Sequence, residues 1–367
     1  MTGKVIGYFC GSESWGGLEM NQLRNARWMR SRGHQVVLFV RNSSKLKSEA
    51  EKEGLPVAVI KKHRKYYDLF KATALRRLIK KYGVTHLIVR DPKDIGICAL
   101  TKSLLAKNLT LAYFMEMQIG ISKRDVLHTI RFKLIDYWVC PLPWLAEQVK
   151  KRTKFPVERI KIIPSGLDLT PFLIPVSKHE ACEKLGISGT KTWIGLIGRF
   201  DEQKGQHILL KAFSRIKENH KDLNLIFLGE KTKDEADEYF HHLLDLIDEL
   251  NLSERVFFKP FRKDVTTFFA AIDIFVMATR AETFGMVTIE AMAAGKKIIG
   301  SNAGGTPEIL GKGKYGQLFE SGNADDLASQ ITKALSDISF DAEKVKEEAL
   351  KYDANLVCEQ VEKVLFN

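Results

Sequence analysis

Short apolar runs alternate along this chain with longer segments that mix apolar and polar residues. The runs have the length and composition of buried strands, and the longer segments repeat apolar residues at helical spacing. Such alternation is typical of β/α units around a parallel sheet. In the first half it predicts strands at KVIGYF, QVVLFV, VAVI, THLIVR, LTLAYF and YWVC. It predicts helices near residues 18–32, 66–81, 93–106, 125–134 and 142–151.

The pattern is interrupted in the middle of the chain and then restarts. The interruption, KIIPSGLDLTPFLIP, combines proline, glycine and aspartate with little periodicity, which is typical of a domain connection. Beyond it we expect strands at TWIGLIG, LNLIFLG, RVFFK, IDIFVMA and KKIIG. Helices are expected near 205–219, 235–250, 264–271, 286–294 and 323–337, followed by helical patterns through 341–366. We therefore predict two doubly wound parallel-sheet domains, at residues 1–170 and 171–352.

Charge is spread unevenly between the two halves. Residues 1–177 hold 32 Lys or Arg against 14 Asp or Glu, whereas residues 178–367 hold 25 against 31. We expect the first half to meet a negative partner, which could be a membrane surface, a phosphorylated acceptor or a nucleic acid. Charge alone leaves these three open.

Cysteine usage and hydropathy indicate the compartment. The five cysteines are dispersed, odd in number and without a CxxC pair, which argues against a disulfide framework or a zinc site. The N-terminal MTGKVIGYFC leads directly into a strand without the layout of a signal peptide. No apolar stretch approaches the roughly 18 residues that span a bilayer. We expect a cytoplasmic protein whose membrane contact, if any, is peripheral.

The second half carries unusual residues at strand ends, where open α/β sheets bind their ligands. The turn GRFDEQKG places Arg199 and Lys204 before a helix, where the helix dipole disfavours cations. An anion such as a diphosphate explains these cations better than a solvated loop does. The spacing excludes a P-loop, because GxxxxGK[ST] is absent.

A second turn, ETFGMVTIEA, follows the strand IDIFVMA. Gly285 and the residues after it would bring backbone N–H groups to a phosphate. Glu290 is a carboxylate in an apolar helix, which is costly unless it binds a group such as the two hydroxyls of a ribose. A structural hydrogen bond to the backbone is the alternative. Glu282 precedes the helix and could reach sugar hydroxyls.

Two further loops lie after predicted strands. In SNAGGTPE, Thr306 is expected to be an N-cap with Pro307 as the first helical residue. In the first half, GSESWGGLE follows the first strand and includes Gly16 and Gly17. Such a loop could cap a phosphate, although a structural strand–helix turn explains it almost as well.

Together these residues resemble family 4 glycosyltransferases of the GT-B fold. Glu282 and Glu290 fit the E-x7-E motif of that family, and GRFDEQKG fits its GR-x4-KG phosphate loop. The later glycine turn corresponds to GGTPE. In the first half, GGLE and RWMRSRGHQVVLF look like the opening motif and the helix and strand after it, and IPSGLDLTPF looks like the linker. The match runs across most of the chain.

The resemblance implies a retaining transfer of a sugar from a nucleotide-diphosphate donor. It implies two Rossmann-like domains facing a central cleft, with a closing helix at about 353–367 that packs on the first domain. Glu282, Arg199 and Lys204 would be the catalytic residues, with the two cations stabilising the leaving diphosphate. No metal or cofactor is implied, and a UDP-sugar is expected rather than a GDP-sugar. The implied donor-binding residues are Gly16, Gly17, Gly198, Phe284, Gly285, Met286, Val287, Glu290 and Arg262.

The chain departs from the family pattern at three places. Gln118 stands where many members have a histidine, Ser165 replaces the linker asparagine, and the loop Lys259–Arg262 replaces a glycine near the nucleobase. In the first domain, the strands THLIV and LTLAYF are followed by polar residues, which we expect to contact the acceptor. These acceptor-side residues are Arg90, Asp91, Glu116 and Gln118.

The segment 61–83, KKHRKYYDLFKATALRRLIKKYG, indicates a class of acceptor. Between residues 61 and 81 it holds nine Lys or Arg and one acid, with an apolar stripe and two tyrosines. It could lie on an anionic membrane, or it could be an ordinary surface helix. With the charge of the first half, it favours a glycan or lipid-linked glycan acceptor in the synthesis of a cell-surface polysaccharide. The alternatives are a basic nucleic-acid-binding protein, a GT-B nucleotide-sugar epimerase and a nucleotide binder without turnover.

Overall fold

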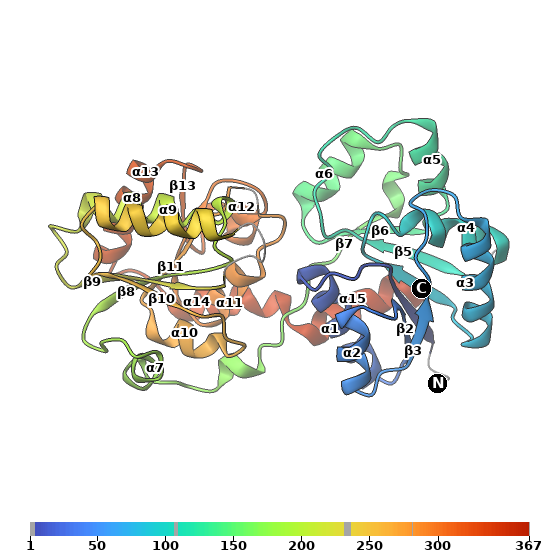
Figure 1. Cartoon of the computed structure of the whole chain (residues 1–367), viewed down its shortest axis with the longest axis horizontal. Coiled ribbons are helices and arrows are strands. Elements are labelled where there is room, and N and C mark those ends of the chain that lie inside the picture. The colour runs from blue at the N-terminus through green and yellow to red at the C-terminus, as the bar shows by residue number, and fades with distance from the viewer. Residues whose placement is uncertain (1–3, 106–108, 231–235, 281, 367) are drawn as a thin grey trace. The chain divides into compact units, whose positions relative to one another are not determined.

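The computed structural model describes residues 4–105, 109–230, 236–280 and 282–366. The chain forms two compact α/β units (Figure 1). Unit 1 contains Met1–Gly166 and Ala354–Asn367, and unit 2 contains Leu167–Asp353. The sequence pattern placed the corresponding boundaries a few residues away, after residues 170 and 352.

Unit 1 is built on a sheet of seven parallel strands in the order β3-β2-β1-β4-β5-β6-β7. Most residues of its central strands are buried, as expected for a parallel sheet that helices cover on both faces. The strands are β1 (Val5–Cys10), β2 (Gln35–Arg41), β3 (Val57–Ile60), β4 (His86–Val89), β5 (Thr110–Phe114), β6 (Tyr137–Cys140) and β7 (Ile160–Ile162).

Two layers of helices enclose this sheet, and each has its own apolar core. One layer consists of α1 (Gly17–Ser31), α2 (Lys45–Lys52) and the C-terminal α15 (Ala354–Phe366). The other consists of α3 (Leu69–Lys81), α4 (Ile95–Leu105), α5 (Val126–Lys133) and α6 (Pro143–Arg152), followed by the 3-10 turn η1 (Val157–Arg159).

Unit 2 is built on six parallel strands in the order β10-β9-β8-β11-β12-β13. They are β8 (Thr192–Ile197), β9 (Leu223–Leu228), β10 (Val256–Lys259), β11 (Ile274–Met277), β12 (Lys297–Ser301) and β13 (Gln317–Phe319). One face packs against α8 (Gln206–Ile216), α9 (Ala236–Glu249) and α13 (Ala324–Ser336). Figure 1 shows the other face covered by α7 (Lys178–Leu185), α10 (Val265–Ala271), α11 (Met286–Ala293) and α14 (Ala342–Ala349).

Short helical turns complete unit 2. The four-residue α12 (Thr306–Ile309) follows β12, and the 3-10 turns are η2 (Thr170–Leu173), η3 (Glu202–Lys204), η4 (Gly311–Gly313) and η5 (Leu350–Tyr352). Together the two parallel sheets confirm the predicted α/β class with two doubly wound domains.

Several short elements were not predicted from the pattern. Helix α2 has only two buried side chains, Leu46 and Ala50, in a charged sequence, so its apolar periodicity is weak. Helix α7 is equally short, and β13 has three residues. Strand β7 begins one residue before the segment assigned to the domain connection and ends inside it, and only three of its residues pair with β6 at the edge of the sheet. These elements form because neighbouring strands pair with them or neighbouring elements pack on them, and their own sequence patterns are weak.

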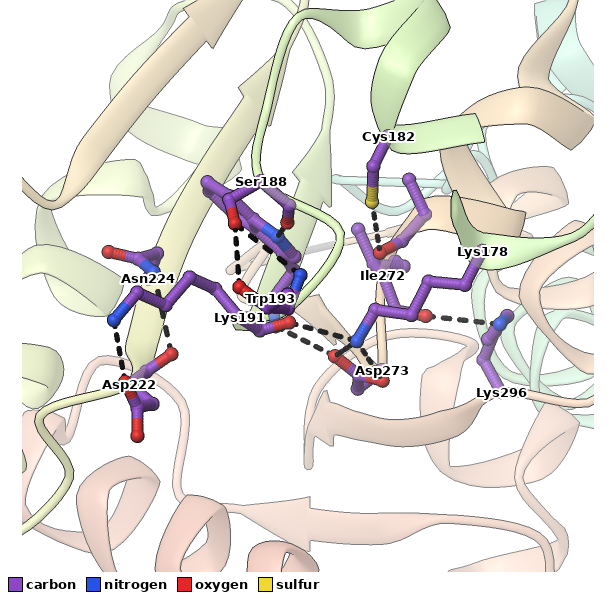
Figure 2. Close-up of polar contacts among 12 residues, drawn as sticks. Lys178, Cys182, Ser188, Lys191, Trp193, Asp222, Asn224, Ile272, Asp273 and Lys296 are labelled. Carbon is purple, nitrogen blue, oxygen red and sulfur yellow. Dashed lines mark hydrogen bonds and ion pairs between the residues drawn. The ribbon is translucent and has the colours of Figure 1, made fainter. Parts of the chain in front are cut away.

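Polar contacts fix α7 to the start of β8 and β11 in unit 2, as Figure 2 shows. The Asp273 carboxylate accepts hydrogen bonds from the Lys178 ammonium at 2.8 Å and from the Trp193 backbone N–H at 2.8 Å. The same ammonium donates to the Lys191 carbonyl at 2.9 Å. At the margin of this network Lys191 pairs with the exposed Asp222 at 2.5 Å. One carboxylate therefore joins a helix to two strands.

The C-terminal helix α15 is held in unit 1 by an apolar face and one polar contact. Val357, Cys358 and Val361 are buried in the same core as α1. The Glu362 carboxylate accepts hydrogen bonds from the Arg32 guanidinium at 2.8 and 2.9 Å and contacts the His34 ring at 2.8 Å. The hydrogen bond from Arg32 lowers the pKa of Glu362 below its ordinary value.

We expect Asp273→Ala to lower the free energy of unfolding by about 1–2 kcal/mol, because it leaves the Lys178 ammonium and the Trp193 N–H without their acceptor. Urea unfolding followed by circular dichroism measures this change. The matched control is Asp222→Ala, which removes an exposed ion pair and should cause no measurable change. Equal stability of the two variants would contradict the joining role of Asp273.

The Glu362 contact should depend on pH. Because the pKa of Glu362 is lowered in the folded chain, its stabilisation is present above the ordinary carboxylate pKa and is lost as the pH falls through the lowered value. We expect Glu362→Gln to cost about 1 kcal/mol at pH 7, with a difference from wild type that shrinks on acidification. Unfolding at a series of pH values measures it. Glu359→Gln, whose carboxylate lies 3.9 Å from Arg32, is the control.

Candidate active site

Three turns of unit 2 lie against one another at the carboxyl ends of β8, β11 and β12, which are neighbouring strands. The N–H of Arg280, after β11, donates to the Gln203 carbonyl after β8 at 3.0 Å. The N–H of Gly305, after β12, donates to the Glu282 carbonyl at 2.8 Å. The turns singled out in the sequence therefore form one continuous surface.

Lys204 and Glu282 meet across the first two of these turns. The Lys204 ammonium lies 3.1 Å from the Glu282 carboxylate, and their side chains are 26% and 20% exposed. The Asp201 carboxylate accepts a hydrogen bond from the Lys204 backbone N–H and so fixes η3. The methylenes of Lys204 pass close to Gly198, where a Cβ would lie 3.2 Å from them. A partly solvated cation and carboxylate are thus held side by side.

Arg199 belongs to the same turn but not to this ion pair. Its side chain is 67% exposed and its guanidinium lies 3.5 Å from Asp201. Its carbonyl accepts a hydrogen bond from the Gln206 side chain at 2.8 Å, which fixes the backbone at this position. The structure therefore presents Arg199 as an exposed cation beside the Lys204–Glu282 pair.

Glycines allow the close packing of these turns. Gly205 has φ +73, and a Cβ there would lie 2.4 Å from the Ala278 carbonyl oxygen. Gly304 has φ +63, and a Cβ there would lie 2.1 Å from the Glu282 carbonyl oxygen. A side chain at either position would push the β8 or β12 turn away from the β11 turn.

Helix α11 begins directly at the site. Its N-cap is Gly285, which has no side chain to form a capping hydrogen bond. Met286 and Val287 are the first two residues of the helix, as predicted from the sequence. Glu290 lies further along α11 and is half-buried. The Phe284 side chain is buried and packs edge-on against Tyr352 at 6.0 Å, so only its backbone belongs to the surface of this turn.

The predicted capping role of Thr306 is wrong. Gly305 is the N-cap of α12 and Thr306 is its first residue. The Thr306 methyl group packs over Gly300 of β12, where a Cβ would lie 2.4 Å from it, and this contact turns the side chain away from the capping position. Its hydroxyl is buried without a hydrogen-bond partner among the described residues.

Arg262 lies after β10, at the same edge of the sheet but two strands away from β8. Its guanidinium donates to the Asp264 carboxylate at 3.3 Å, and Asp264 is the N-cap of α10. The structure does not bring Arg262 into contact with the Lys204–Glu282 pair.

Unit 1 places two of the predicted acceptor-side residues together. The buried Arg90 guanidinium forms a hydrogen-bonded ion pair with Glu116, and the other Glu116 oxygen accepts from the Asn21 amide at 3.0 Å. These groups line a pocket with Asn25 and Trp28 of α1, and apolar residues such as Phe114 complete its lining. Neither Asp91 nor Gln118 lines it. Asp91 accepts from the Lys93 N–H at 2.8 Å, and Gln118 is exposed.

The sequence analysis missed the contribution of α1 to this pocket. Asn21, Asn25 and Trp28 repeat at helical spacing on one face of α1. Asn25 is buried and accepts a hydrogen bond from the Tyr8 hydroxyl at 2.8 Å. Polar residues on a helix face that should pack against the sheet were the available signal.

The glycine-rich loop after β1 is tied to its surroundings by polar contacts that the sequence analysis also missed. The Gly16 N–H donates to the Glu19 carboxylate at 2.9 Å, which starts α1 at Gly17. The Gly11 N–H donates to Asp94 at 2.7 Å, and Asp94 also contacts the His63 ring at 2.9 Å. Although burial lowers the pKa of His63, the hydrogen bond to Asp94 raises it above the ordinary value.

The described residues include no group of three or more His, Cys, Asp or Glu side chains placed to hold a metal ion. The five cysteines are buried and free. The candidate site of unit 2 contains the polar side chains of Lys204, Glu282 and Arg199. The pocket of unit 1 contains the Arg90–Glu116 pair.

The chain matches two protein families. Residues 15–170 match Glycosyltransferase Family 4, and residues 177–352 match Glycosyl transferases group 1. Together these two regions include the candidate residues of both units.

Curated relatives are similar over part or most of the chain. Spore coat protein SA of Bacillus subtilis (strain 168) is 34% identical over 200 residues, which cover 50% of this chain and 52% of the relative. D-inositol 3-phosphate glycosyltransferase of Mycobacterium sp. (strain KMS) is 30% identical over 52% of this chain and 43% of its own length. N-acetyl-alpha-D-glucosaminyl L-malate synthase of Bacillus anthracis is 30% identical over 74% of this chain and 70% of its own length. The chain thus spans about half the length of the first two relatives.

Solved structures share the fold along the whole chain. A glycosyltransferase from Rickettsia africae ESF-5 has a TM-score of 0.88 and 21% identity, with all of both chains covered. Anabaena Alr3699/HepE in complex with UDP has a TM-score of 0.86 and 21% identity over 99% of both chains. With the family matches and the two parallel sheets, these similarities confirm the resemblance drawn from the motifs. The chain belongs to the family 4 glycosyltransferases and has the GT-B type of fold.

Proposed function

We propose that this glycosyltransferase moves a sugar from a nucleoside-diphosphate donor to an acceptor hydroxyl with retention of configuration. The observation that carries the proposal is the Lys204–Glu282 contact, at 3.1 Å, between turns of two adjacent strands. A partly exposed cation next to a carboxylate offers one group to a diphosphate and one to sugar hydroxyls. The Anabaena structures in complex with UDP and with UDP-glucose support a UDP-sugar as the donor.

The two cations of the β8 turn would stabilise the leaving group. Breaking the bond between the anomeric carbon and the diphosphate leaves negative charge on the phosphate oxygens. Lys204 and the exposed Arg199 would carry the compensating charge, without a metal ion or cofactor. The acceptor oxygen would bond to the anomeric carbon on the face that the diphosphate leaves, and its proton would pass to a phosphate oxygen. This path gives retention.

Other parts of the donor would contact the rest of the same surface. The start of α11, at Gly285, Met286 and Val287, presents backbone N–H groups and the positive end of the helix dipole to phosphate or sugar oxygens. The half-buried Glu290 would accept hydrogen bonds from the ribose hydroxyls. Gly16, Gly17 and Arg262 stay predictions from the family resemblance.

For the acceptor we propose a glycan or lipid-linked glycan of a cell-surface polysaccharide. The pocket of unit 1 combines an ion pair, Arg90 with Glu116, with the amide of Asn21 and the ring of Trp28. Hydroxyl groups of a sugar can both donate to and accept from such groups. Among the described residues no helix is long and apolar enough to span a bilayer. We propose peripheral contact with the cytoplasmic side of an anionic membrane through residues 61–81.

We expect Glu282→Gln to lower turnover about 100-fold with little loss of stability, because the carboxylate is partly exposed and pairs with the Lys204 ammonium. Release of the nucleotide from a panel of UDP-, GDP- and ADP-sugars measures turnover, and thermal unfolding measures stability. Wild-type turnover in Glu282→Gln, with the preferred donor, would rule out its role. If wild type releases no nucleotide from any donor, the chain binds nucleotide without turnover or is not a transferase.

We expect Lys204→Met and Arg199→Ala each to weaken UDP binding about tenfold, because each removes a charge-assisted contact to the diphosphate. Titration calorimetry measures the dissociation constant. Arg215→Ala is the control, because Arg215 is a cation of unit 2 that pairs with Asp325 on α13, and its exposed fraction of 40% lies between those of Lys204 and Arg199. Unchanged affinity in both test variants would refute the assigned diphosphate site.

A further inference from the structure

Two segments of unit 1 expose large apolar side chains to solvent. In the first, at the start of α3, Phe70 is 88% exposed and its neighbours Tyr67 and Leu69 are more than half exposed. In the second, around α5, Val126 is 71% exposed, and Ile121, Leu127 and Ile130 are exposed as well. Soluble domains rarely gather so many exposed apolar side chains unless they bind another surface.

The two segments lie on the same side of unit 1 and are joined. Helix α4 packs between α3 and α5, and Figure 1 shows the three helices side by side. The Tyr66 ring meets the His128 ring edge-on at 6.1 Å. The Arg131 guanidinium lies 5.3 Å from the centre of the Tyr66 ring and 4.9 Å from that of Phe132. The apolar side chains of both segments therefore belong to one face, which we call the basic–apolar face (residues 61–81 and 121–133).

The lysines and arginines of this face have no carboxylate partners in the part of the chain that the structure describes. Residues 61–81 hold nine Lys or Arg and one acid, and residues 121–133 hold four and one. Among the described residues none of these cations forms an ion pair, whereas lysines of α2, α6 and η5 each pair with a glutamate. Arg131 is buried with two guanidinium nitrogens that lack a hydrogen-bond partner. The positive charge of the face can therefore bind an external anion.

A hollow between α3 and the edge strand β3 continues the face. Its lining combines apolar and basic residues. Its lining includes Val59, Phe70 and Leu78, with Lys61, Lys71 and Arg77.

We propose that the basic–apolar face docks on an anionic phospholipid bilayer. Its lysines and arginines bind the phosphate head groups, while Phe70, Val126 and their apolar neighbours enter the interfacial region. A nucleic acid would also attract the cations, but it would leave the exposed Leu69, Val126 and Leu127 without a partner. This inference rests on the peripheral membrane contact in the proposed function, and it adds α5 to the surface that makes the contact.

Co-sedimentation of the full chain with vesicles tests the proposal. We expect binding to phosphatidylglycerol-containing vesicles at low salt, weaker binding at high salt, and little binding to pure phosphatidylcholine. Inorganic phosphate at the concentration of the accessible lipid phosphate should not compete, because the apolar contacts require a bilayer. Failure of wild type to bind anionic vesicles would overturn the proposal.

Single substitutions separate the two segments. Phe70→Ser on α3 and Val126→Asp on α5 should each lower the fraction bound about tenfold, because each removes an inserted apolar side chain. Ile338→Asp is the control, since Ile338 is a fully exposed apolar residue of unit 2, and it should leave binding unchanged. All three side chains are exposed, so thermal unfolding should not change. If Val126→Asp binds like wild type, α5 is not part of the docking surface and the joint face is refuted.

A nucleic-acid partner is tested in the same assay. If a duplex oligonucleotide displaces the chain from vesicles and its own binding is insensitive to Val126→Asp, the lipid assignment is overturned. UDP affinity of Phe70→Ser and Val126→Asp in solution should equal that of wild type. If the wild-type chain binds UDP but not vesicles, only the docking proposal is refuted. If it binds vesicles but not UDP, only the proposed donor site is refuted.

Discussion

The ammonium of Lys204 lies 3.1 Å from the Glu282 carboxylate, although the two residues are 78 positions apart in the chain. This contact requires that β8 and β11 be neighbours and that their following turns touch. Gly205 permits that touch, because any side chain there would meet the Ala278 carbonyl. The same packing sets the start of α11 next to the pair, because a Cβ on Gly285 would lie 3.1 Å from the Glu282 side chain. The site of unit 2 therefore depends on one close approach of two backbones.

Unit 1 divides its polar chemistry between two places. At the carboxyl ends of its strands, Arg90 and Glu116 neutralise each other and share a pocket with polar residues of α1. On the basic–apolar face (residues 61–81 and 121–133), the lysines and arginines have no such partners among the described residues. A paired charge can orient hydroxyl groups without attracting anions in general, whereas unpaired charges attract any anionic surface. The pocket therefore suits hydroxyl groups, and the basic–apolar face suits an anionic surface.

Local sequence predicted the long elements and missed the short ones. Strands such as β1 and β9 are continuous apolar runs, and α8 and α13 have clear apolar faces. Helix α2 and strand β13 have weak patterns of their own and exist because neighbouring elements pair with them or cover them. Thr306 was assigned as a cap from its position before a proline, but packing on β12 turned its side chain elsewhere.

The sequence by itself determined the fold class, the family and the turns that carry the candidate chemistry, because periodicity and motif spacing are local properties. Only the tertiary structure decided which of those residues meet. It paired Lys204 with Glu282 and left Arg199 exposed, joined Arg90 to Glu116 but not to Gln118, and tied Gly11 through Asp94 to His63. It also placed α5 against Tyr66, in the basic segment that precedes α3. These contacts follow from strand order and helix packing, which bring distant positions together and which no local pattern encodes.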